Sequence, residues 1–555
     1  MPYSFRLFLS ELCLLACLLP GLTLADHVRE LQQQAVETKN GAFGHWGWHR
    51  ENYLGWGSHS NRLIPVYTFG TAQAGPGISL KSYVGPHSPY ASEEKLKQLY
   101  GSVPYGTHNA NPPYFDQTNI FDIQKAALTA GKKHIILIIF DGTDWQTTWA
   151  ASTYKNKRVA YTSGRGTGLH VQDYQANGTT EFGWMVTSPW CDSAEIDVDA
   201  QTVKIDDSTL RGGYAHEVAG LYPWSVPTDE KYLVGKSETK EHKQAYTDSS
   251  TSAASMTSGV KSFNASINVR VDGTHAPTIA EQAQQKGYKI GVVTSVPISH
   301  ATPGAAYAHN VHRSDYQDIT RDLLGLPSVS HPEHPLPGVD VLMGAGFGAE
   351  RSKDNGQGKN FVPGNAYLTL QDQQTVDVRN GGKYVIAQRT AGVKGIEELQ
   401  IRADEAIQGK HRLLGFFGTK YGHLPFQTAD GNFDPTIGRS KKAEKYTEND
   451  LIENPTLSQL AETALDVLNA HDSPFWLMVE AGDVDWANHD NNIDNSIGAF
   501  LSGDAAVKTV TDWVEKNSSW DETVLIVTAD HGHYLNLDHP ELLVPDADGT
   551  SPDQK

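Results

Sequence analysis

The sequence predicts an α/β fold, a large doubly wound and mostly parallel sheet with helices on both faces. Unbroken apolar runs typical of buried strands recur along the chain, helical patterns lie between them, and polar residues follow the runs. The runs are HIILIIF at 134–140, KIGVVTSV at 289–296, VDVLM at 339–343, RLLGFF at 412–417, PFWLMV at 474–479 and TVLIVTA at 523–529.

Three segments between these runs have the signals of helices. Residues 277–286 open with Pro277 and close before Gly287, a common arrangement of helix boundaries. Residues 455–470 and 505–514 each carry an apolar stripe at helical spacing. Strand, helix and strand in this alternation indicate a doubly wound sheet.

Residues 1–25 resemble a signal peptide, with Arg6 in the n-region, an apolar run at 12–19 and a cut after Ala25. A lipoprotein cut before Cys17 is the alternative, less favoured because it would leave an apolar tail behind it. No later stretch approaches the roughly 18 to 20 apolar residues that a membrane span needs. We therefore expect an exported chain, periplasmic or extracellular, without a membrane span.

Charge and cysteine content exclude several classes of site. A formal net charge of −20 argues against nucleic acid as a partner, although a bound metal could still attract a small phosphorylated substrate. Cys191 would be the single cysteine of the mature chain, so a cysteine zinc site is excluded. Any metal must be held by histidine, aspartate or glutamate.

The chain divides into an N-terminal segment, residues 26–130, and a main domain, residues 131–555. Two polar, turn-rich stretches at about 143–243 and 346–446 are interpreted as insertions at the mouth of the sheet. The N-terminal segment contains a cluster of aromatic residues and histidines, namely Trp46, Trp48, Trp56, His45, His49 and His59. We interpret it as packing for a segment that wraps the main domain, with a binding platform as the alternative.

The stretch AYTDSSTSAASMTSGVKSFN at 245–264 combines a carboxylate, a hydroxyl and a run of small residues. Gly259 offers a helix stop, so Ser249 is expected at a helix N-terminus, where free N–H groups favour an anion. A serine there is well placed to attack phosphorus. The alternative is an ordinary N-cap without chemistry.

Further polar residues follow the predicted strands, and in an open α/β sheet ligands bind outside the carboxyl ends of the strands. These residues are Asp141, His300, Thr302, Glu480, Asp530 and His531. Asp485 and His489 are four residues apart and can share a metal on one helical turn. Histidine and carboxylates suit zinc, and carboxylate with hydroxyl suits magnesium.

These segments resemble the alkaline phosphatase family in five separated motifs that occur in the family's order between Asp141 and His533. The motifs are IIFDGTDW at 138–145, TDSSTSAASMTSGVKSFN at 247–264, SHATPGAAYAHNVHR at 299–313, VEAGDVDWANH at 479–489 and TADHGH at 528–533. The resemblance implies an alkaline phosphatase-like catalytic domain over 131–555. It also implies hydrolysis of small phosphate monoesters through a phosphoserine intermediate. Members of the family are commonly dimers, so the resemblance offers a homodimer as an expectation.

The resemblance assigns roles residue by residue. Ser249 becomes phosphorylated, Arg313 grips the phosphate, and Asp248 can fix the Arg313 guanidinium. The family carries two zinc ions and one magnesium. The implied ligands are Asp485 and His489 for the first zinc, Asp141, Asp530 and His531 for the second zinc, and Asp141, Thr302 and Glu480 for magnesium, with His300 beside the magnesium and His533 supporting the first zinc.

The sequence departs from the family in two respects. His300 and Trp486 stand where some members have Asp and Lys, which removes a negative charge near magnesium. The family's further histidine on the first zinc lies well downstream of the Asp-His pair, whereas only His539 follows His533 here, without the family context. We expect either a truncated chain, the favoured interpretation, or a first zinc completed by water.

Two other functions remain open. A phosphodiesterase of the same superfamily would use a similar metal scaffold, whereas a sulfatase modification motif is absent from TDSSTSAAS. A catalytically impaired metal- or phosphate-binding protein would result if the missing histidine disables the first zinc site.

Overall fold

A ten-stranded sheet forms the centre of the computed structural model, which describes residues 27–544. The predicted signal peptide lies outside the described residues. In spatial order the strands are β12 (Tyr384–Gln388), β13 (Arg412–Phe416), β9 (Val341–Ala345), β8 (Lys289–Pro297), β14 (Phe475–Ala481), β4 (His134–Phe140), β15 (Thr523–Thr528), β2 (Ile64–Phe69), β5 (Glu181–Val186) and β3 (Tyr114–Asp116). Neighbours from β12 to β15 run parallel, β2 is antiparallel to both of its neighbours, and β3 is parallel to β5.

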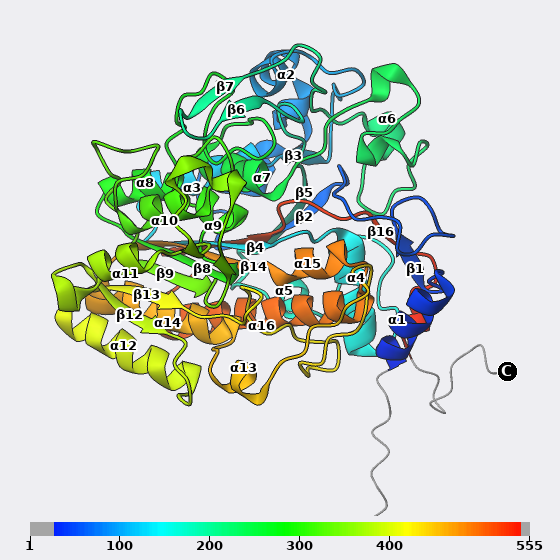
Figure 1. Ribbon diagram of the computed structural model, residues 1–555. Coiled ribbons are helices and arrows are strands. Elements are labelled where there is room, and N and C mark those ends of the chain that lie inside the picture. The colour runs from blue at the N-terminus through cyan, green and yellow to red at the C-terminus, as the bar shows by residue number, and fades with distance from the viewer. Residues whose placement is uncertain (1–26, 545–555) are drawn as a thin grey trace, which may run out of the picture.

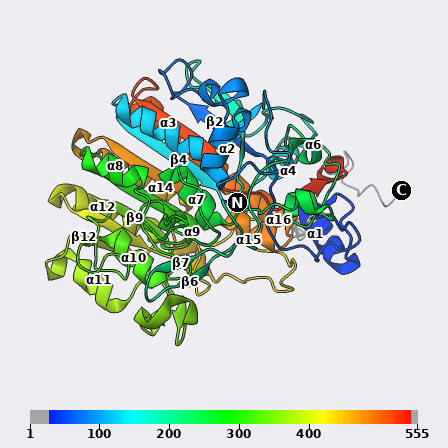
Figure 2. The same cartoon turned by 90° about the horizontal axis from the view of Figure 1, so that it is seen from above.

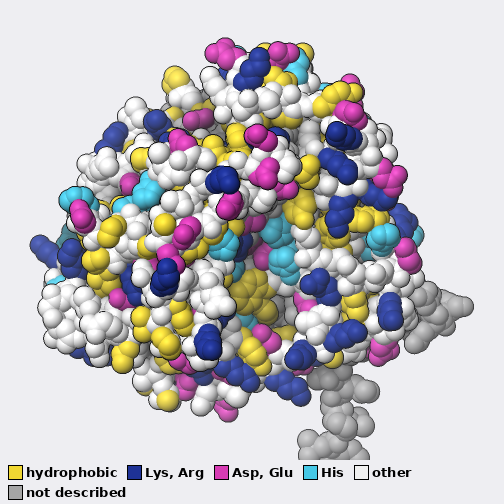
Figure 3. Space-filling model, turned by 45° about the horizontal axis from the view of Figure 1, so that its top comes forward, with side chains coloured by type: hydrophobic (Ala, Val, Ile, Leu, Met, Phe, Trp, Pro, Cys, Tyr) yellow, Lys and Arg dark blue, Asp and Glu magenta, His cyan; other side chains and the backbone are white. Residues whose placement is uncertain are grey.

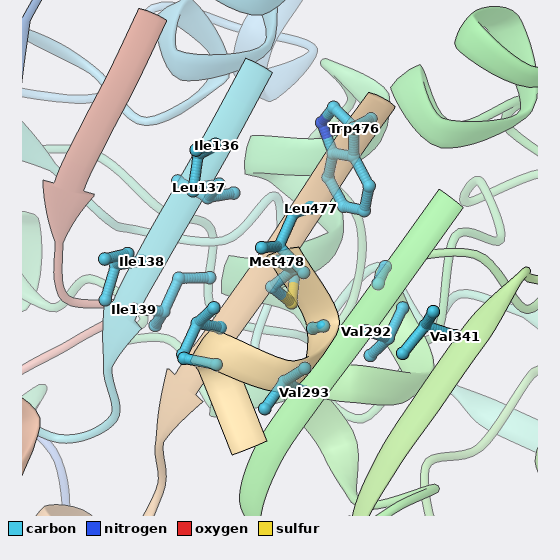
Figure 4. Close-up of a cluster of buried hydrophobic side chains, with 14 of the residues drawn as sticks. Ile136, Leu137, Ile138, Ile139, Val292, Val293, Val341, Trp476, Leu477 and Met478 are labelled. Atoms are coloured by element: carbon cyan, nitrogen blue, oxygen red, sulfur yellow. The ribbon is translucent and has the colours of Figure 1, made fainter. Parts of the chain in front are cut away.

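The prediction of a mostly parallel α/β sheet is confirmed. All six apolar runs form strands of this sheet, and β4 has the predicted ends, His134 and Phe140. The two central strands β4 and β14 are buried along their whole length, as strands covered on both faces must be. Figure 4 shows the apolar side chains of β4, β14, β8 and β9 packed together in this core.

Helices cover both faces of the sheet (Figures 1 and 2). One layer holds α3 (Thr118–Thr129), α7 (Ser249–Ser258), α8 (Ile279–Gln285), α9 (Ala301–Ala305) and α10 (Tyr316–Leu324). The other holds α4 (Trp145–Asn156), α12 (Gly395–Gly409), α14 (Leu457–Asn469) and α16 (Ile493–Asn517). The predicted helix at 505–514 is the second half of the longer α16, which begins at Ile493.

Four strands of the sheet were not expected from the sequence. β2 and β3 come from the N-terminal segment, so this segment enters the main sheet as well as packing on it. β5 and β12 lie in the two stretches interpreted as loop insertions, and each stretch therefore contributes to the sheet. Pro65 in β2, Gly183 in β5 and the three-residue length of β3 weaken the periodic signal on which strand prediction depends.

The N-terminal segment also reaches the chain beyond β15. Strand β1 (Gly44–Trp46) pairs antiparallel with β16 (Leu535–Leu537), and helix α1 (His27–Thr38) lies beside them (Figure 1). Trp46 and Trp56 belong to a second buried apolar cluster together with Tyr53 and Leu535. Segments from opposite ends of the described chain are thus packed against each other.

Helix α7 has the boundaries that its sequence predicts. The Asp248 side chain caps its N-terminus by accepting a hydrogen bond from the Thr251 N–H at 3.1 Å. Gly259 ends the helix with φ 71°, in the left-handed region. All ten residues of α7 are buried, because small side chains let α3 and α9 pack closely around it.

The structure also bears on the cysteines and on the expected lack of a membrane span. Cys191 is buried and free, and the other two cysteines lie outside the described residues. Among residues 27–544, none of the helices combines the length and the apolar character needed to cross a bilayer.

Replacing Gly259 with alanine should destabilise the protein more than an ordinary positive-φ glycine would. An added Cβ would lie 2.5 Å from the Phe121 ring, whereas a Cβ at Gly178, φ 80°, would have no atom within 4 Å. We expect Gly178→Ala to lower the free energy of unfolding by about 1 kcal/mol through backbone strain alone, and Gly259→Ala by about 2 to 4 kcal/mol. Urea denaturation measures both, and equal losses would contradict the steric argument.

Candidate functional site

The predicted site residues converge at the carboxyl edge of the sheet. Asp141 follows β4, Glu480 is the second-to-last residue of β14, and Asp530 and His531 lie just beyond β15. All four are fully buried. The parallel register of these neighbouring strands brings their ends together, as the strand-end argument predicts.

Ser249 is the first residue of α7 and faces this edge. Its Oγ lies 3.3 Å from Asp141 Oδ1 and 3.0 Å from His531 Nε2. The hydroxyl therefore sits between a carboxylate and an imidazole, at a helix N-terminus that favours negative charge. This arrangement can position an oxygen nucleophile beside a metal and an anion.

Asp141, Asp530 and His531 form one group of possible metal ligands. His531 Nε2 lies 3.4 Å from Asp141 Oδ1 and 3.4 Å from Asp530 Oδ2. The other Asp530 oxygen, Oδ1, accepts hydrogen bonds from the N–H groups of Gly142 and His531 at 2.9 and 2.8 Å. Gly142 has φ 69°, and a Cβ there would lie 2.8 Å from Asp485 Cα, so glycine permits the close approach of this segment.

Thr302 and Glu480 supply a second set of oxygen atoms. Glu480 accepts a hydrogen bond from Thr294 Oγ1 through Oε2. Four buried oxygens at this edge lack a hydrogen-bond partner among residues 27–544, namely Asp141 Oδ2, Thr302 Oγ1, Glu480 Oε1 and Asp530 Oδ2. Unpaired buried oxygens are costly, and hard cations prefer carboxylate and hydroxyl ligands, so the donor set fits metal ions.

Helix α15 (Asp483–His489) carries the third set. Its Asp485 and His489 lie one turn apart, with Asp485 Oδ1 3.6 Å from His489 Nε2. His533 Nε2 is 2.6 Å from the same Asp485 oxygen, a hydrogen-bond distance that orients the carboxylate. The structure brings Asp485, His489 and His533 together at one place.

Arg313 and Asp248 form an ion pair at the edge of the site. The Arg313 guanidinium donates to Asp248 Oδ2 at 3.0 Å, and the same carboxylate accepts from the Ser250 hydroxyl at 2.7 Å. Burial raises the pKa of Asp248, but the Arg313 charge and these hydrogen bonds hold it below its usual range. Asp248 thus both caps the nucleophile helix and holds the arginine.

His300 precedes α9 and lies two positions before Thr302 in the chain. Its ring lies near the rings of Tyr316 and Trp486, and its buried Nδ1 has no hydrogen-bond partner among residues 27–544. Its role beside magnesium stays a prediction.

His59 is a residue of the site that the sequence interpretation missed. It belongs to the N-terminal aromatic cluster, yet its ring stacks on His531 with centroids 3.7 Å apart. His59, Asp485, His531 and His533 form a group of possible ligands whose donor atoms lie within 4.8 Å of one another. Figure 3 shows histidine side chains along the wall of a hollow in this face of the molecule.

Nothing in the spacing of the N-terminal histidines distinguished His59. His45 and His49 take other positions: His45 lies 3.5 Å from Asp538, and the exposed His49 lies 3.0 Å from Glu51. His539, the remaining histidine beyond His533, is exposed and lies 3.1 Å from Glu541 Oε1, away from the site.

The buried carboxyl groups of the site need added positive charge in order to stay ionised. Burial raises the pKa of Glu480 to about 8 and that of Asp530 to about 6. Burial and the neighbouring carboxylates of Asp485 and Asp530 raise the pKa of Asp141 well above its usual range. Bound divalent cations reverse this effect because they favour the ionised carboxylates.

The histidines are shifted in the opposite direction. Burial and the neighbouring His533 lower the pKa of His59 to about 3, and burial lowers that of His531 well below its usual range. Both imidazoles are therefore neutral, which is the form that binds metal. Burial raises the pKa of Asp485, but the neighbouring His489 ring and the hydrogen bond with His533 hold it well below its usual range.

Comparison with known proteins points to one family. A family model described as Alkaline phosphatase matches residues 217–544. Alkaline phosphatase 3 of Bacillus subtilis (strain 168) is 28% identical over 304 residues, which cover 54% of this chain and 53% of that protein. Alkaline phosphatase of Escherichia coli (strain K12) is 27% identical over 349 residues, covering 61% of this chain and 69% of that protein.

A solved structure shares a weaker likeness. The alkaline phosphatase from the Antarctic bacterium TAB5 gives a TM-score of 0.42 at 21% identity, covering 72% of this chain and 80% of that chain. The match to the Bacillus relative spans about half of that protein's length.

Without metal ions, the protein should lose stability as the pH rises from about 7 to about 8. The pKa of Glu480 is raised from 4.5 to about 8, so in this range the folded state holds a proton that the unfolded state has released. Buried histidines such as His59, whose pKa is lowered, favour the opposite trend only at lower pH, where the unfolded state still protonates them. Since the folded state binds more protons between pH 7 and 8, the free energy of unfolding falls with pH. Urea midpoints of chelator-treated protein at pH 7, 7.5 and 8 measure the slope.

Two comparisons test the cause of this slope. Glu480→Gln should flatten the profile because it removes the carboxyl whose pKa is raised to about 8, and zinc with magnesium should flatten it by binding the folded state. A metal-free protein whose urea midpoint is the same at pH 7 and pH 8 would contradict the buried-carboxylate account.

Proposed function

This chain belongs to the alkaline phosphatase family, and on that premise we propose that it hydrolyses phosphate monoesters to an alcohol and inorganic phosphate. The observation that carries the proposal is the position of Ser249 Oγ, at a helix N-terminus and within 3.3 Å of both Asp141 Oδ1 and His531 Nε2. The Arg313 guanidinium, held by Asp248, faces the same site.

Three metal ions would be held by the residues that the structure brings together. The buried oxygens without a hydrogen-bond partner and the neutral imidazoles are suitable ligands for such ions. Asp485 and His489 would hold one zinc, Asp141, Asp530 and His531 would hold the second zinc, and Asp141, Thr302 and Glu480 would hold magnesium. When bound, the ions keep the carboxylates ionised, lower the pKa of the serine hydroxyl and of water, and stabilise the leaving oxygen. His300 in place of a carboxylate leaves one negative charge fewer near magnesium.

Ser249 acts as the nucleophile. Its Oγ loses its proton and attacks phosphorus, the ester oxygen leaves in line with it, and the leaving oxygen takes up a proton to become the alcohol. A water molecule then attacks the phosphoserine from the same side on which the alcohol left, which returns the serine hydroxyl and releases inorganic phosphate. The N-terminal N–H groups of α7 stabilise the negative charge near Ser249.

Arg313 binds and orients the phosphate. One guanidinium nitrogen is engaged by Asp248 at 3.0 Å, which leaves other N–H groups for two phosphate oxygens in a bidentate arrangement. Asp248 thereby fixes the direction of the guanidinium and, as the cap of α7, couples it to the position of Ser249. Arg313 and Ser249 both act on the phosphate group. Few of these site residues contact the alcohol part of the substrate, so the enzyme is expected to hydrolyse many different monoesters.

An open cleft beside the site would admit the substrate. It is lined among others by Leu54, Tyr421, Arg439, Lys442 and Trp486, and it borders His489. Its charged lining residues are Arg439, Lys442, Glu444 and Asp490, so the cleft brings both signs of charge to the entrance.

Export is part of the proposal. The signal-peptide pattern at 1–25 supports a periplasmic or extracellular enzyme. The enzyme would then bind zinc and its substrate outside the cytoplasm.

Ser249→Ala should abolish phosphate release from p-nitrophenyl phosphate, and no phosphoserine should be trapped by acid, because the substitution removes the attacking oxygen.

Arg313→Ala should lower kcat/KM by about 10² to 10³-fold, since it removes a charged group that stabilises the transferred phosphoryl. Ser258→Ala is the matched control: Ser258 is the last residue of the same helix, and its hydroxyl donates to the Ala254 carbonyl at 2.7 Å, away from the site.

A comparison of substrates separates the proposal from its nearest alternative. Wild-type protein loaded with zinc and magnesium should hydrolyse p-nitrophenyl phosphate faster than bis(p-nitrophenyl) phosphate. A strong preference for the diester would show a phosphodiesterase instead. Tight metal binding without a trappable phosphoserine would show a non-catalytic binding protein.

A further inference from the structure

The chain around His59 is attached to the segment that carries Asp530, His531 and His533. The N–H of Ser60 donates to the Gly532 carbonyl at 2.9 Å, and the indole N–H of Trp56 donates to the His533 carbonyl at 2.8 Å. His59 lies between these two anchors. The hydrogen bonds of the Ser60 backbone and the Trp56 indole therefore fix the position of His59 beside the metal ligands.

Hydrogen bonds define which nitrogen of His59 is free. Nδ1 lies 2.9 Å from the Thr247 carbonyl oxygen, and because a carbonyl only accepts, Nδ1 carries the hydrogen. Nε2 of the neutral ring is then an acceptor with a lone pair. His489 has the same arrangement, with Nδ1 2.9 Å from the Gly57 carbonyl oxygen. Metal-binding histidines commonly donate their second nitrogen to a carbonyl in this way.

The two free nitrogens face each other. His59 Nε2 lies 3.2 Å from His489 Nε2, so two lone pairs would point at one another with no hydrogen between them. A shared cation resolves this conflict. In a tetrahedral zinc site with Zn–N bonds of 2.0 to 2.1 Å, two ligand nitrogens lie about 3.3 to 3.4 Å apart, close to the observed separation.

Asp485 completes the triangle. Its Oδ1 lies 3.6 Å from His489 Nε2 and 3.9 Å from His59 Nε2. His533 is a poorer candidate for the third ligand, because its Nε2 is already 2.6 Å from the same Asp485 oxygen, which is a hydrogen bond that leaves no room for an ion between the two atoms.

We propose that His59, from the N-terminal segment, is the third protein ligand of the metal ion that Asp485 and His489 hold. The family resemblance places the corresponding histidine far downstream of His531, whereas here an imidazole reaches the site from the opposite end of the chain. The inference rests on the proposed metal-dependent function and deepens it. With His59 the site has two imidazoles and one carboxylate, and one position remains open for substrate or water.

The test measures zinc binding by wild-type protein, His59→Asn, His59→Gln and His49→Asn. Asparagine keeps an N–H donor for the Thr247 carbonyl and removes Nε2, and glutamine provides a second, longer replacement. His49 is the matched control because it lies in the same segment but is 56% exposed and paired with Glu51. Competition with a zinc chelator gives affinities, cobalt substitution gives the visible spectrum of the site, and far-UV circular dichroism verifies the fold of each variant.

Wild-type protein and His49→Asn should bind two zinc ions tightly and give an intense tetrahedral cobalt spectrum. Both His59 variants should lose about 10²-fold or more in the affinity of one zinc, with a weaker cobalt spectrum and the other zinc unchanged. Wild-type affinity and spectrum in either folded His59 variant would overturn the assignment. Wild-type protein that binds both zinc ions, one of them through His59, but forms no phosphoserine would instead overturn the proposed function alone.

Discussion

Buried negative charge at the carboxyl edge of the sheet is the constraint on which the rest of the site depends. The strand ends and α15 place Asp141, Glu480, Asp485 and Asp530 together and remove them from water. Burial of several carboxylates is unfavourable unless cations or protons compensate them. The neutral histidines around them, the unpaired oxygens and the nearby serine hydroxyl are all explained by the same requirement, a place for metal ions.

Much of this arrangement could be predicted from the sequence, because the signals are local. A buried parallel strand is a continuous apolar run, and a ligand at its end follows it directly in the chain, as Asp141 follows β4 and Asp530 follows β15. The cap and stop of α7, Asp248 and Gly259, are equally local. The pairing of Asp248 with Arg313 followed from the resemblance together with the chemistry of the two groups.

What the sequence could not show depends on long-range pairing. β2 reaches the sheet by pairing with β15, although more than 450 residues separate Phe69 from Leu525. His59 comes to the metal ligands by the same route, through Ser60 on Gly532, and no spacing rule relates it to His489. Trp46 and Trp56, from the same aromatic cluster as His59, are packed in a buried apolar cluster, as expected from the sequence. The sequence does not identify His59 as the histidine of the cluster that faces the site.

X-ray diffraction from crystals of zinc-loaded protein, with anomalous data at the zinc edge, tests the account most directly. The account predicts one peak among Asp141, Asp530 and His531, and a second within about 2.0 to 2.1 Å of Nε2 of both His59 and His489. A second peak that has Asp485 and His489 as neighbours but leaves the His59 ring turned away would contradict the third-ligand assignment. The lack of any anomalous peak at the carboxyl edge of the sheet would contradict the metal site as a whole.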